Sequence, residues 1–488
     1  MDTILQYPTE TVRSMRPFSL TTLALATLTL MSACAVQEPG APAAKNVVLF
    51  IGDGMGVSTV TAARIFDGQS RGLQGEEHVL SFERFPNVAL VKTYNTNQQT
   101  ADSAGTATAM VTGTKTRAGV INIAPQALRE DCEASLVNPL RSIGEIARDR
   151  GAGVGFVTTA RVTHATPAVV YAHSPDRDWE SDHATPAAAR QLGCADIASQ
   201  LINANIDVAL GGSRKSFFGG NHGGERLDPD ANLPQEWLAA APDRRYVETA
   251  AELGELRPGE QVLGLFAHSH MTYVAELEKD STEPSLSEMT AMAIRQLEEN
   301  ANGYFLMVEA GRIDHGHHDG KPGYALIETQ ALNEAVETAL SMVDLDETLI
   351  LVTADHSHVF TMGGYSTRGS PILGYVVEND DQGNPEPEPD IALDGQPYTI
   401  LSYANGRGAV IETPRARPET GVHAVAQSLV PVVNYNADGS IRDQDETHGG
   451  EDVALYAIGP GSNAVRGVME QNLIFDVMMD ALRWKDAL

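Results

Sequence analysis

Runs of apolar and β-branched residues alternate with amphipathic stretches along most of the chain. The apolar runs predict strands at Asn46–Ile51, Val88–Lys92, Gly153–Thr158, Ile206–Leu210, Tyr304–Val308, Thr348–Thr353 and Ala454–Ile458. The amphipathic stretches predict helices at Pro139–Arg150, Pro186–Asn203, Ser285–Glu299, Gly323–Met342 and near Met469–Leu482. Strands that alternate with helices in this way indicate an α/β fold, with a mostly parallel central sheet between layers of helices.

Two stretches depart from this alternation. Arg214–Pro242 is rich in Gly, Pro and Asp, which predicts a long surface excursion. From Gly363 to Glu446 the chain carries acidic, Pro-rich and Gly-rich segments between short strand-like pieces, which predicts a small inserted β-rich subdomain over residues 363–446. The main α/β domain would then comprise residues 46–362 and 447–488.

The N-terminal residues have the pattern of a targeting segment. Arg13 and Arg16 precede the apolar run Leu20–Leu30, which ends in small residues before Cys34. The run is too short to span a bilayer, so it predicts a signal peptide over residues 1–33 and an exported protein, periplasmic, attached to the outer membrane or secreted. Cys34 would be the lipidated first residue of a lipoprotein, or cleavage would occur nearby without lipid; a short linker, 34–45, follows.

Composition narrows the possible partners. The formal net charge of −31 excludes nucleic acid on electrostatic grounds, and an anionic substrate would need local positive charge from a metal or an arginine. Apart from Cys34, the chain has two cysteines, Cys132 and Cys194. Neither has a partner at metal-binding spacing, so in an oxidising compartment we expect them to form a disulfide.

Polar groups that could bind metals follow several of the predicted strands. These groups are Asp53, Glu309 with Asp314 and His318, Asp355 with His356, and His448, which precedes the last predicted strand. The carboxyl ends of parallel strands meet at one edge of a sheet, so these side chains should converge. Mixed carboxylate and imidazole groups without thiolates suit Zn²⁺, and a site of oxygens alone suits Mg²⁺.

Each of these groups also has an ordinary structural interpretation. Asp53 with Gly54 could form a turn, His315 and His317 are more often structural than ligands at such positions, and His358 is expected behind the ligands.

Asp102 and Ser103 begin a run of small, helix-compatible residues. This position predicts a helix N-terminus, which favours an anion. Taken alone the pair is an ordinary helix cap. Beside two cations, Ser103 could be a metal-activated nucleophile for phosphate, whereas Asp102 is expected to order the turn.

The motifs together resemble those of alkaline phosphatases, of the branch with a crown subdomain that is best known from animals. The resemblance rests on Thr100–Thr108, Glu309–His318, Thr353–His358 and Thr447–Asp452, and it covers nearly all of the chain from Asn46 to Pro460. It implies hydrolysis of phosphate monoesters through a phosphoserine intermediate, with two Zn²⁺ and one Mg²⁺, in a protein that is usually a homodimer.

The resemblance also implies roles for individual residues. Ser103 would be the nucleophile and Arg177 would clamp the phosphate. One zinc would be held by Asp314, His318 and His448, the other by Asp53, Asp355 and His356 with Ser103, and the magnesium by Asp53, Glu309 and Thr166. Asp102, His164, His315 and His358 would lie around the substrate and the ligands. Cys132 and Cys194 match a disulfide of the family.

This chain departs from the animal-type pattern in places. The calcium site of those enzymes is doubtful here, because Ala267 replaces an acidic ligand and only Phe266 and Glu283 remain. The second family disulfide is missing, and the short linker leaves no room for an N-terminal arm around the partner subunit.

Rival interpretations remain for the function. A sulfatase would need a Cys-x-Pro-x-Arg motif, which follows none of the cysteines. A phosphodiesterase of the same superfold, or a surface lipoprotein that binds metal or phosphate without turnover, are the remaining alternatives.

Overall fold

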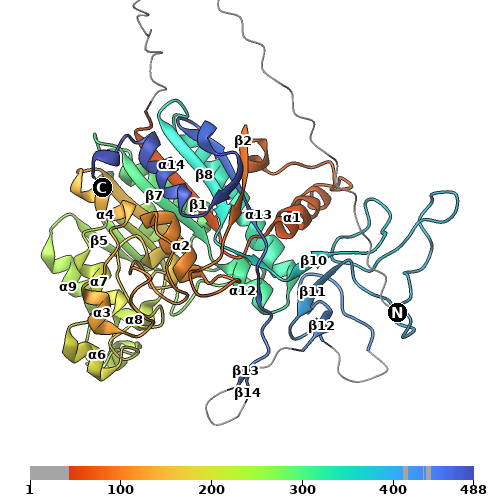
Figure 1. The fold of residues 1–488 in the computed structure, drawn as a ribbon, viewed down its shortest axis with the longest axis horizontal. Coiled ribbons are helices and arrows are strands. Elements are labelled where there is room, and N and C mark those ends of the chain that lie inside the picture. The colour runs from red at the N-terminus through yellow and green to blue at the C-terminus, as the bar shows by residue number, and fades with distance from the viewer. Residues whose placement is uncertain (1–42, 410–415, 432–433, 436–440, 488) are drawn as a thin grey trace, which may run out of the picture. The chain divides into compact units, whose positions relative to one another are not determined.

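A ten-stranded sheet forms the centre of the computed structural model, which describes residues 43–409, 416–431, 434–435 and 441–487 (Figure 1). The predicted signal peptide, Cys34 and most of the linker lie outside the described residues. Within the described residues, no helix combines the length and the apolar character that a membrane span requires.

The strands of the large sheet follow one another in space in an order that differs from their order in the chain. Across the sheet the order is β17 (Gly467–Glu470), β2 (Asn87–Lys92), β16 (Val453–Ile458), β8 (Thr348–Ala354), β1 (Asn46–Gly52), β7 (Tyr304–Ala310), β3 (Gly153–Arg161), β4 (Val208–Gly212), β6 (Gln261–Leu265) and β5 (Arg244–Val247). Only β16 is antiparallel to its neighbours. The predicted α/β class with a mostly parallel sheet is therefore confirmed.

Helices cover both faces of this sheet. Parallel crossovers are right-handed, so connections that run in opposite directions along the sheet place their helices on opposite faces. One face carries α1 (Val57–Ser70), α11 (Leu286–Leu297) and α13 (Pro322–Met342), which pack on one another. The other carries α2 (Ser103–Thr112), α4 (Ile143–Asp149), α7 (Ile197–Asn203) and α9 (Leu233–Ala240), with α14 (Leu473–Ala481) packed on α2.

The remaining helices are short. They are α3 (Cys132–Leu136), α5 (Ala165–Ala168), α6 (Ala187–Leu192), α8 (Arg214–Phe217), α10 (Ala250–Gly254) and α12 (Arg312–His318). Five single turns of 3-10 helix are η1 (Ser81–Arg84), η2 (Gly220–His222), η3 (Val274–Glu276), η4 (Ser462–Ala464) and η5 (Lys485–Ala487).

Small sheets lie in and beside the region between the main-domain segments. Two of them include residues of 363–446: one is formed by β10 (Phe360–Met362), β11 (Leu401–Asn405) and β12 (Ser428–Val430), the other by β13 (Asn434–Tyr435) with β14 (Ile441–Asp443). The third, β9 (Ser357–His358) with β15 (His448–Gly449), pairs main-domain residues from the two sides of that region. The first two sheets fit the inserted β-rich segment that the sequence predicts.

Two predicted helices differ from those observed. The stretch Pro186–Asn203 is divided into α6 and α7, because Gly193 adopts a left-handed conformation, φ 98°, that ends α6. Near Met469–Leu482 the chain first forms β17, and the helix α14 begins only at Leu473.

The segment Arg214–Pro242 is also more ordered than its composition suggests. It contains α8 and α9, and Phe217 and Trp237 are buried in the main core. The prediction of a surface excursion is wrong for these residues, because apolar side chains spaced along a Gly-rich and Pro-rich segment can still anchor it to the core.

The predicted disulfide is present. Cys132 at the start of α3 is bonded to Cys194 after α6, at a sequence separation of 62 residues. The two cysteines pack with Trp179 and Ala189 in a small cluster that is separate from the main core. The disulfide therefore closes a long loop at a place where few apolar contacts hold it.

Replacing both cysteines by alanine should lower the free energy of unfolding by about 2–4 kcal/mol, because the unfolded chain regains the freedom of that loop. Urea unfolding of the double variant beside the parent protein measures this difference. Identical unfolding midpoints would show that the bond contributes nothing.

The buried acid Glu328 on α13 makes stability depend on pH. Burial raises the pKa of Glu328 to about 7, although the N–H of Val274 donates to Oε1 at 2.8 Å and the charge of Arg312 opposes the rise. As pH increases from about 4.5 to 7, the unfolded chain releases this proton before the folded protein does. Stability attributable to Glu328 is therefore complete at acid pH and lost above pH 7.

Glu328→Gln keeps an acceptor for Val274 and removes the ionisation. The variant should be more stable than the parent at pH 8, by up to about 3 kcal/mol, and nearly equal to it at pH 5. Denaturant unfolding at both values tests this; a difference that does not change with pH would refute the assignment.

Candidate active site

Ser103 is placed at the N-terminus of α2. Asp102 caps the helix by accepting a hydrogen bond from the N–H of Gly105 at 3.2 Å, and the left-handed Gly113 ends it. The helix residues between them are small and almost completely buried, so α2 packs closely against its neighbours. Ser103, only 2% exposed, thus lies where free N–H groups and the helix dipole favour an anion.

Asp102 has its own set of partners. Its carboxylate accepts from the N–H of Gly119 at 2.8 Å and from Nδ2 of Asn95 at 2.7 Å, and Nη1 of Arg177 lies 3.2 Å away. Burial alone would raise the pKa of Asp102, but the charge of Arg177 and the backbone donors hold it below its ordinary value. Asp102 therefore stays ionised and orders the turn, as the sequence predicts, and it also holds Arg177.

The ends of β1 and β8 bring a first group of ligand atoms to Ser103. Oγ of Ser103 lies 3.2 Å from Nε2 of His356 and 3.5 Å from Oδ1 of Asp53. His356 Nε2 is in turn 3.3 Å from Oδ2 of Asp355. Asp53, Asp355 and His356 are close enough to share one ion.

Gly54 lets these two strand ends approach each other. Its N–H donates to Oδ1 of Asp355 at 3.0 Å, and its φ of +71° lies in the left-handed region. A Cβ at this position would lie 2.4 Å from the ring of His358. Glycine is thus required both by the backbone angle and by the close approach.

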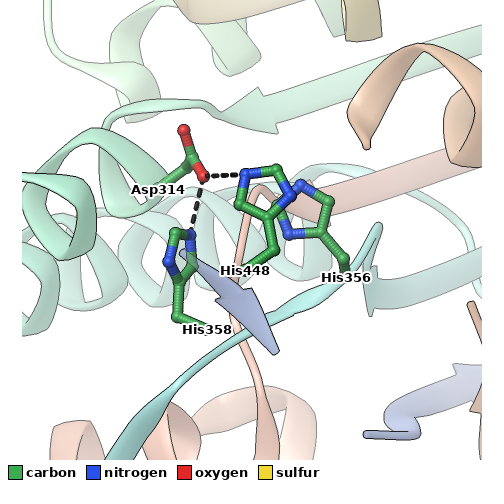
Figure 2. A group of neighbouring side chains, drawn as sticks. All are labelled: Asp314, His356, His358 and His448. Carbon is green, nitrogen blue, oxygen red and sulfur yellow. Dashed lines mark hydrogen bonds and ion pairs between the residues drawn. The ribbon is translucent and has the colours of Figure 1, made fainter. Parts of the chain in front are cut away.

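A second group contains Asp314, His318 and His448. Asp314 and His318 face the same side of α12, as their four-residue spacing predicts, with Oδ1 3.3 Å from Nε2. Nε2 of His448 lies 3.5 Å from the same Oδ1 and 3.1 Å from Nε2 of His318. Figure 2 shows Asp314, His356, His358 and His448 converging from separate segments of the chain.

Backbone carbonyls fix the orientation of two of these imidazoles. Nδ1 of His318 donates to the carbonyl of Glu446 at 2.7 Å, and Nδ1 of His448 donates to the carbonyl of Ala101 at 2.7 Å. Nε2 of each ring is then left with a lone pair toward the other ligands. This is the arrangement in which histidine binds a metal.

A third group lies between β1, β7 and the segment after β3. Asp53, Glu309 and His164 have ligand atoms within reach of one ion. Thr158 donates to Oε2 of Glu309, and Thr166 is completely buried in the same part of the fold. The structure thus places His164 beside the predicted set of Asp53, Glu309 and Thr166, with its Nε2 3.0 Å from Nη2 of Arg177.

The donor atoms of these groups fit cations. Four buried oxygens have no hydrogen-bond partner among the described residues: Oδ2 of Asp53, Oγ1 of Thr166, Oε1 of Glu309 and Oδ2 of Asp355. Burial, reinforced by mutual repulsion, raises the pKa of Asp53 and Asp355, and raises that of Glu309 to about 7. Unpaired carboxylates at this depth are costly, and bound cations would remove the cost.

Two of the candidate imidazole ligands, His356 and His448, are neutral, as metal ligands must be. Burial lowers the pKa of His356 to about 3, and burial with the charge of His356 lowers that of His448. Burial lowers the pKa of the third, His318, but Asp314 raises it above its ordinary value. Asp314 differs from the other acids: burial opposes its ionisation, but His318 and His358 hold its pKa well below the ordinary value.

The remaining histidines of the motif do not join these groups. His315 accepts a hydrogen bond at Nδ1 from Arg312 at 3.0 Å. His317 is buried between Oγ1 of Thr59 at 3.0 Å and the hydroxyl of Tyr403 at 2.8 Å, so its position is structural.

Glu446 is a residue that sequence reasoning missed. Its Oε2 lies 2.6 Å from Nδ1 of His358, whose Nε2 lies 2.7 Å from Oδ1 of Asp314. Although burial lowers the pKa of His358, the carboxylates of Glu446 and Asp314 raise it to about 10. Glu446 thus holds His358 against Asp314, and its carbonyl also holds His318. The signal available in the sequence is an acid directly before the motif that begins at Thr447.

Glu446→Gln should weaken zinc binding by roughly 10–100-fold, because His358 is then held against Asp314 without a charged partner. Asp445→Asn is the matched control, since Asp445 is a neighbouring, partly exposed acid whose partner is Arg407. Zinc affinity is measured by competition with a chelator. Equal affinities in the two variants would contradict the positioning role of Glu446.

The comparisons with known proteins agree with this site. The alkaline phosphatase family model matches residues 44–484. The chain is 44% identical to the tissue-nonspecific alkaline phosphatase of Gallus gallus over 468 residues, 91% of this chain and 86% of the relative. It is 42% identical to the alkaline phosphatase of Gadus morhua over 463 residues, 91% of this chain and 93% of the relative.

Solved structures show the same fold at lower identity. The alkaline phosphatase of Thermus thermophilus matches with a TM-score of 0.65 at 23% identity, covering 94% of this chain and 96% of that one. The enzyme of the Antarctic bacterium TAB5 matches with a TM-score of 0.60 at 22% identity, covering 91% and 99%. Together with the family match over nearly all of the described residues, these relatives show that the chain belongs to the alkaline phosphatases, enzymes that hydrolyse phosphate monoesters.

Proposed function

We propose that this alkaline phosphatase transfers the phosphoryl group of a monoester to Ser103 and then to water. The observation that carries the proposal is the position of Oγ of Ser103 at the start of α2, 3.2 Å from His356 and 3.5 Å from Asp53. Unpaired carboxylate oxygens are buried beside it. A hydroxyl at a helix N-terminus and next to cation sites is suited to attack on phosphate.

Alkaline phosphatases use two zinc ions and one magnesium ion, and three groups of side chains fit three ions. We assign one zinc to Asp314, His318 and His448, the other to Asp53, Asp355 and His356, and the magnesium to Asp53, Glu309 and Thr166. A variant of the TAB5 enzyme holds magnesium in a site called M3. When bound, the ions supply positive charge that favours ionisation of a nearby hydroxyl and offsets charge on the phosphoryl group.

The reaction proceeds by two displacements. Oγ of Ser103 forms a bond to phosphorus while the ester oxygen leaves as the alcohol, and water later displaces Ser103 to release inorganic phosphate. Arg177 would grip two non-bridging oxygens with its planar guanidinium. Asp102 keeps that guanidinium in place at 3.2 Å. A monoester has three non-bridging oxygens and a diester only two, so a diester held by Arg177 has no further oxygen for the cations. The clamp therefore favours monoesters over the diesters of the alternative interpretation.

Ser103→Ala should abolish nearly all turnover of p-nitrophenyl phosphate, because no atom remains to accept the phosphoryl group. Bound zinc and magnesium should stay, as determined by elemental analysis of the purified variant. The parent enzyme should cleave this monoester much faster than bis-p-nitrophenyl phosphate. Full activity in the variant would refute the nucleophile, and equal or faster diester cleavage would favour a phosphodiesterase.

We also propose the organisation of the whole protein from the sequence. Residues 46–362 and 447–488 form the catalytic domain, and 363–446 form the inserted crown-like subdomain. The apolar run before Cys34 supports export, with membrane attachment through a lipid on Cys34. Similarity to alkaline phosphatases of the animal type supports a homodimer.

A further inference from the structure

Beside the candidate active site, three histidines from separate segments lie in ring contact. His164 follows β3, His270 follows β6 and His315 belongs to α12. The ring centroids of His270 and His315 are 4.1 Å apart, and His164 lies 5.4 Å from His270 and 5.7 Å from His315. Neither the metal groups nor the nucleophile requires His270.

Each of these histidines accepts a hydrogen bond from an arginine. Nη2 of Arg177 lies 3.0 Å from Nε2 of His164, and Nη1 of Arg312 lies 3.0 Å from Nδ1 of His315. Nη1 of Arg161 contacts Nε2 of His270.

Arginine can only donate, so the contacted nitrogen of each histidine is the acceptor. The other nitrogen of a neutral ring must then carry the hydrogen. The three arginines thus fix the tautomers.

Three donors in this cluster have no acceptor. They are Nδ1 of His164, Nδ1 of His270 and Nε of Arg312, which are buried and lack a hydrogen-bond partner among the described residues. Burial, with the charges of His315 and Arg161, lowers the pKa of His270 far below its ordinary value, so its ring is neutral and Nδ1 is an N–H donor. Buried donors without acceptors are uncommon in folded proteins, and a ligand can satisfy them.

The charges of the cluster are not balanced. Arg161 is paired with Glu180 and Arg177 with Asp102. In the part of the chain that the structure describes, no carboxylate forms an ion pair with Arg312, whose guanidinium instead lies 3.6 Å from the ring centroid of Tyr273. The charge of Arg312 acts on the buried acid Glu328 through its field, where it opposes the rise in the pKa of that carboxyl.

Resting on the proposed monoesterase function, we propose that Arg312, His270 and His315 form a subsite for a second anionic group on the leaving alcohol of the substrate. Carboxylate and phosphate both have the acceptor oxygens that these N–H donors need. The subsite adjoins the phosphoryl site through His164, which contacts Arg177 on one side and both other rings on the other. The preferred substrates are therefore monoesters of carboxylated or phosphorylated alcohols.

A pair of aryl esters tests the subsite. 4-Carboxyphenyl phosphate and 4-carbamoylphenyl phosphate have nearly the same shape, but only the first carries a second negative charge. The parent holoenzyme should show a kcat/KM ratio of roughly ten in favour of the carboxylate, as expected for one charge-assisted contact. The corresponding 3-substituted pair covers the other direction of approach, and a ratio near one for both pairs would overturn the proposal.

Two variants and a control connect this ratio to the cluster. His270→Gln keeps an acceptor for Arg161 but removes the Nδ1 donor, and Arg312→Met removes the charge while keeping contact with Tyr273. Both should lower the ratio to about one to three and leave kcat/KM for the carbamoyl ester within about threefold. His268→Asn, on the exposed neighbour in the same loop, should leave the ratio unchanged.

Three outcomes separate failure of the subsite from failure of the proposed function. An equal loss for both esters would show that the cluster only positions Arg177, and an unchanged ratio in both variants would exclude a role in recognition. If no ester is hydrolysed, the proposed function fails, and calorimetry of 4-carboxyphenylphosphonate against 4-carbamoylphenylphosphonate still measures the subsite. Tighter binding of the carboxylate, lost in His270→Gln, supports it; equal binding overturns it.

Discussion

Repulsion among buried carboxylates is the constraint on which the rest of this site depends. Asp53, Glu309 and Asp355 lie at the ends of neighbouring parallel strands, are completely buried, and have oxygens without hydrogen-bond partners. Ionised groups at that depth are costly unless a cation is present. The buried carboxylates therefore destabilise the folded protein when no cation is bound. Metal binding removes this repulsion, so it contributes to the stability of the fold as well as to its chemistry.

Hydrogen bonds from neighbouring groups fix the side chains and strand ends around these carboxylates. Backbone carbonyls hold the rings of His318 and His448, and Glu446 holds the ring of His358. These hydrogen bonds keep the ring nitrogens in place when no metal is bound. Gly54 adds a backbone hydrogen bond across two strand ends. A site fixed in this way needs little rearrangement when it binds ions or a phosphoryl group, so the free-energy cost of reorganisation is small. Such preorganisation is the main source of electrostatic catalysis.

Burial and charge along each strand determine how much of the fold the sequence predicts. Strands β1, β7 and β8 are buried on both faces, so they appear as continuous apolar runs, and the candidate ligands at their ends could be predicted from position. The edge strands β5 and β17 carry charged residues and have no such run, and they were missed. Glu446 and His270 come from irregular segments whose place beside the site depends on tertiary packing, which no local pattern encodes.

The distribution of charge links the acidic chain to its anionic substrate. A net charge of −31 repels phosphate esters at long range, but the Debye length of about 8 Å at physiological salt confines that field, so nearby charges decide binding. Arg161, Arg177 and Arg312 gather around three histidines at the edge of the metal groups, and among the described residues carboxylates form ion pairs with Arg161 and Arg177 but not with Arg312. A substrate with an anionic group on its alcohol is attracted by these arginines at both its phosphoryl end and its alcohol end. A substrate with a neutral alcohol is attracted only at its phosphoryl end. Recognition of the alcohol therefore follows from the same local surplus of positive charge that admits the phosphate.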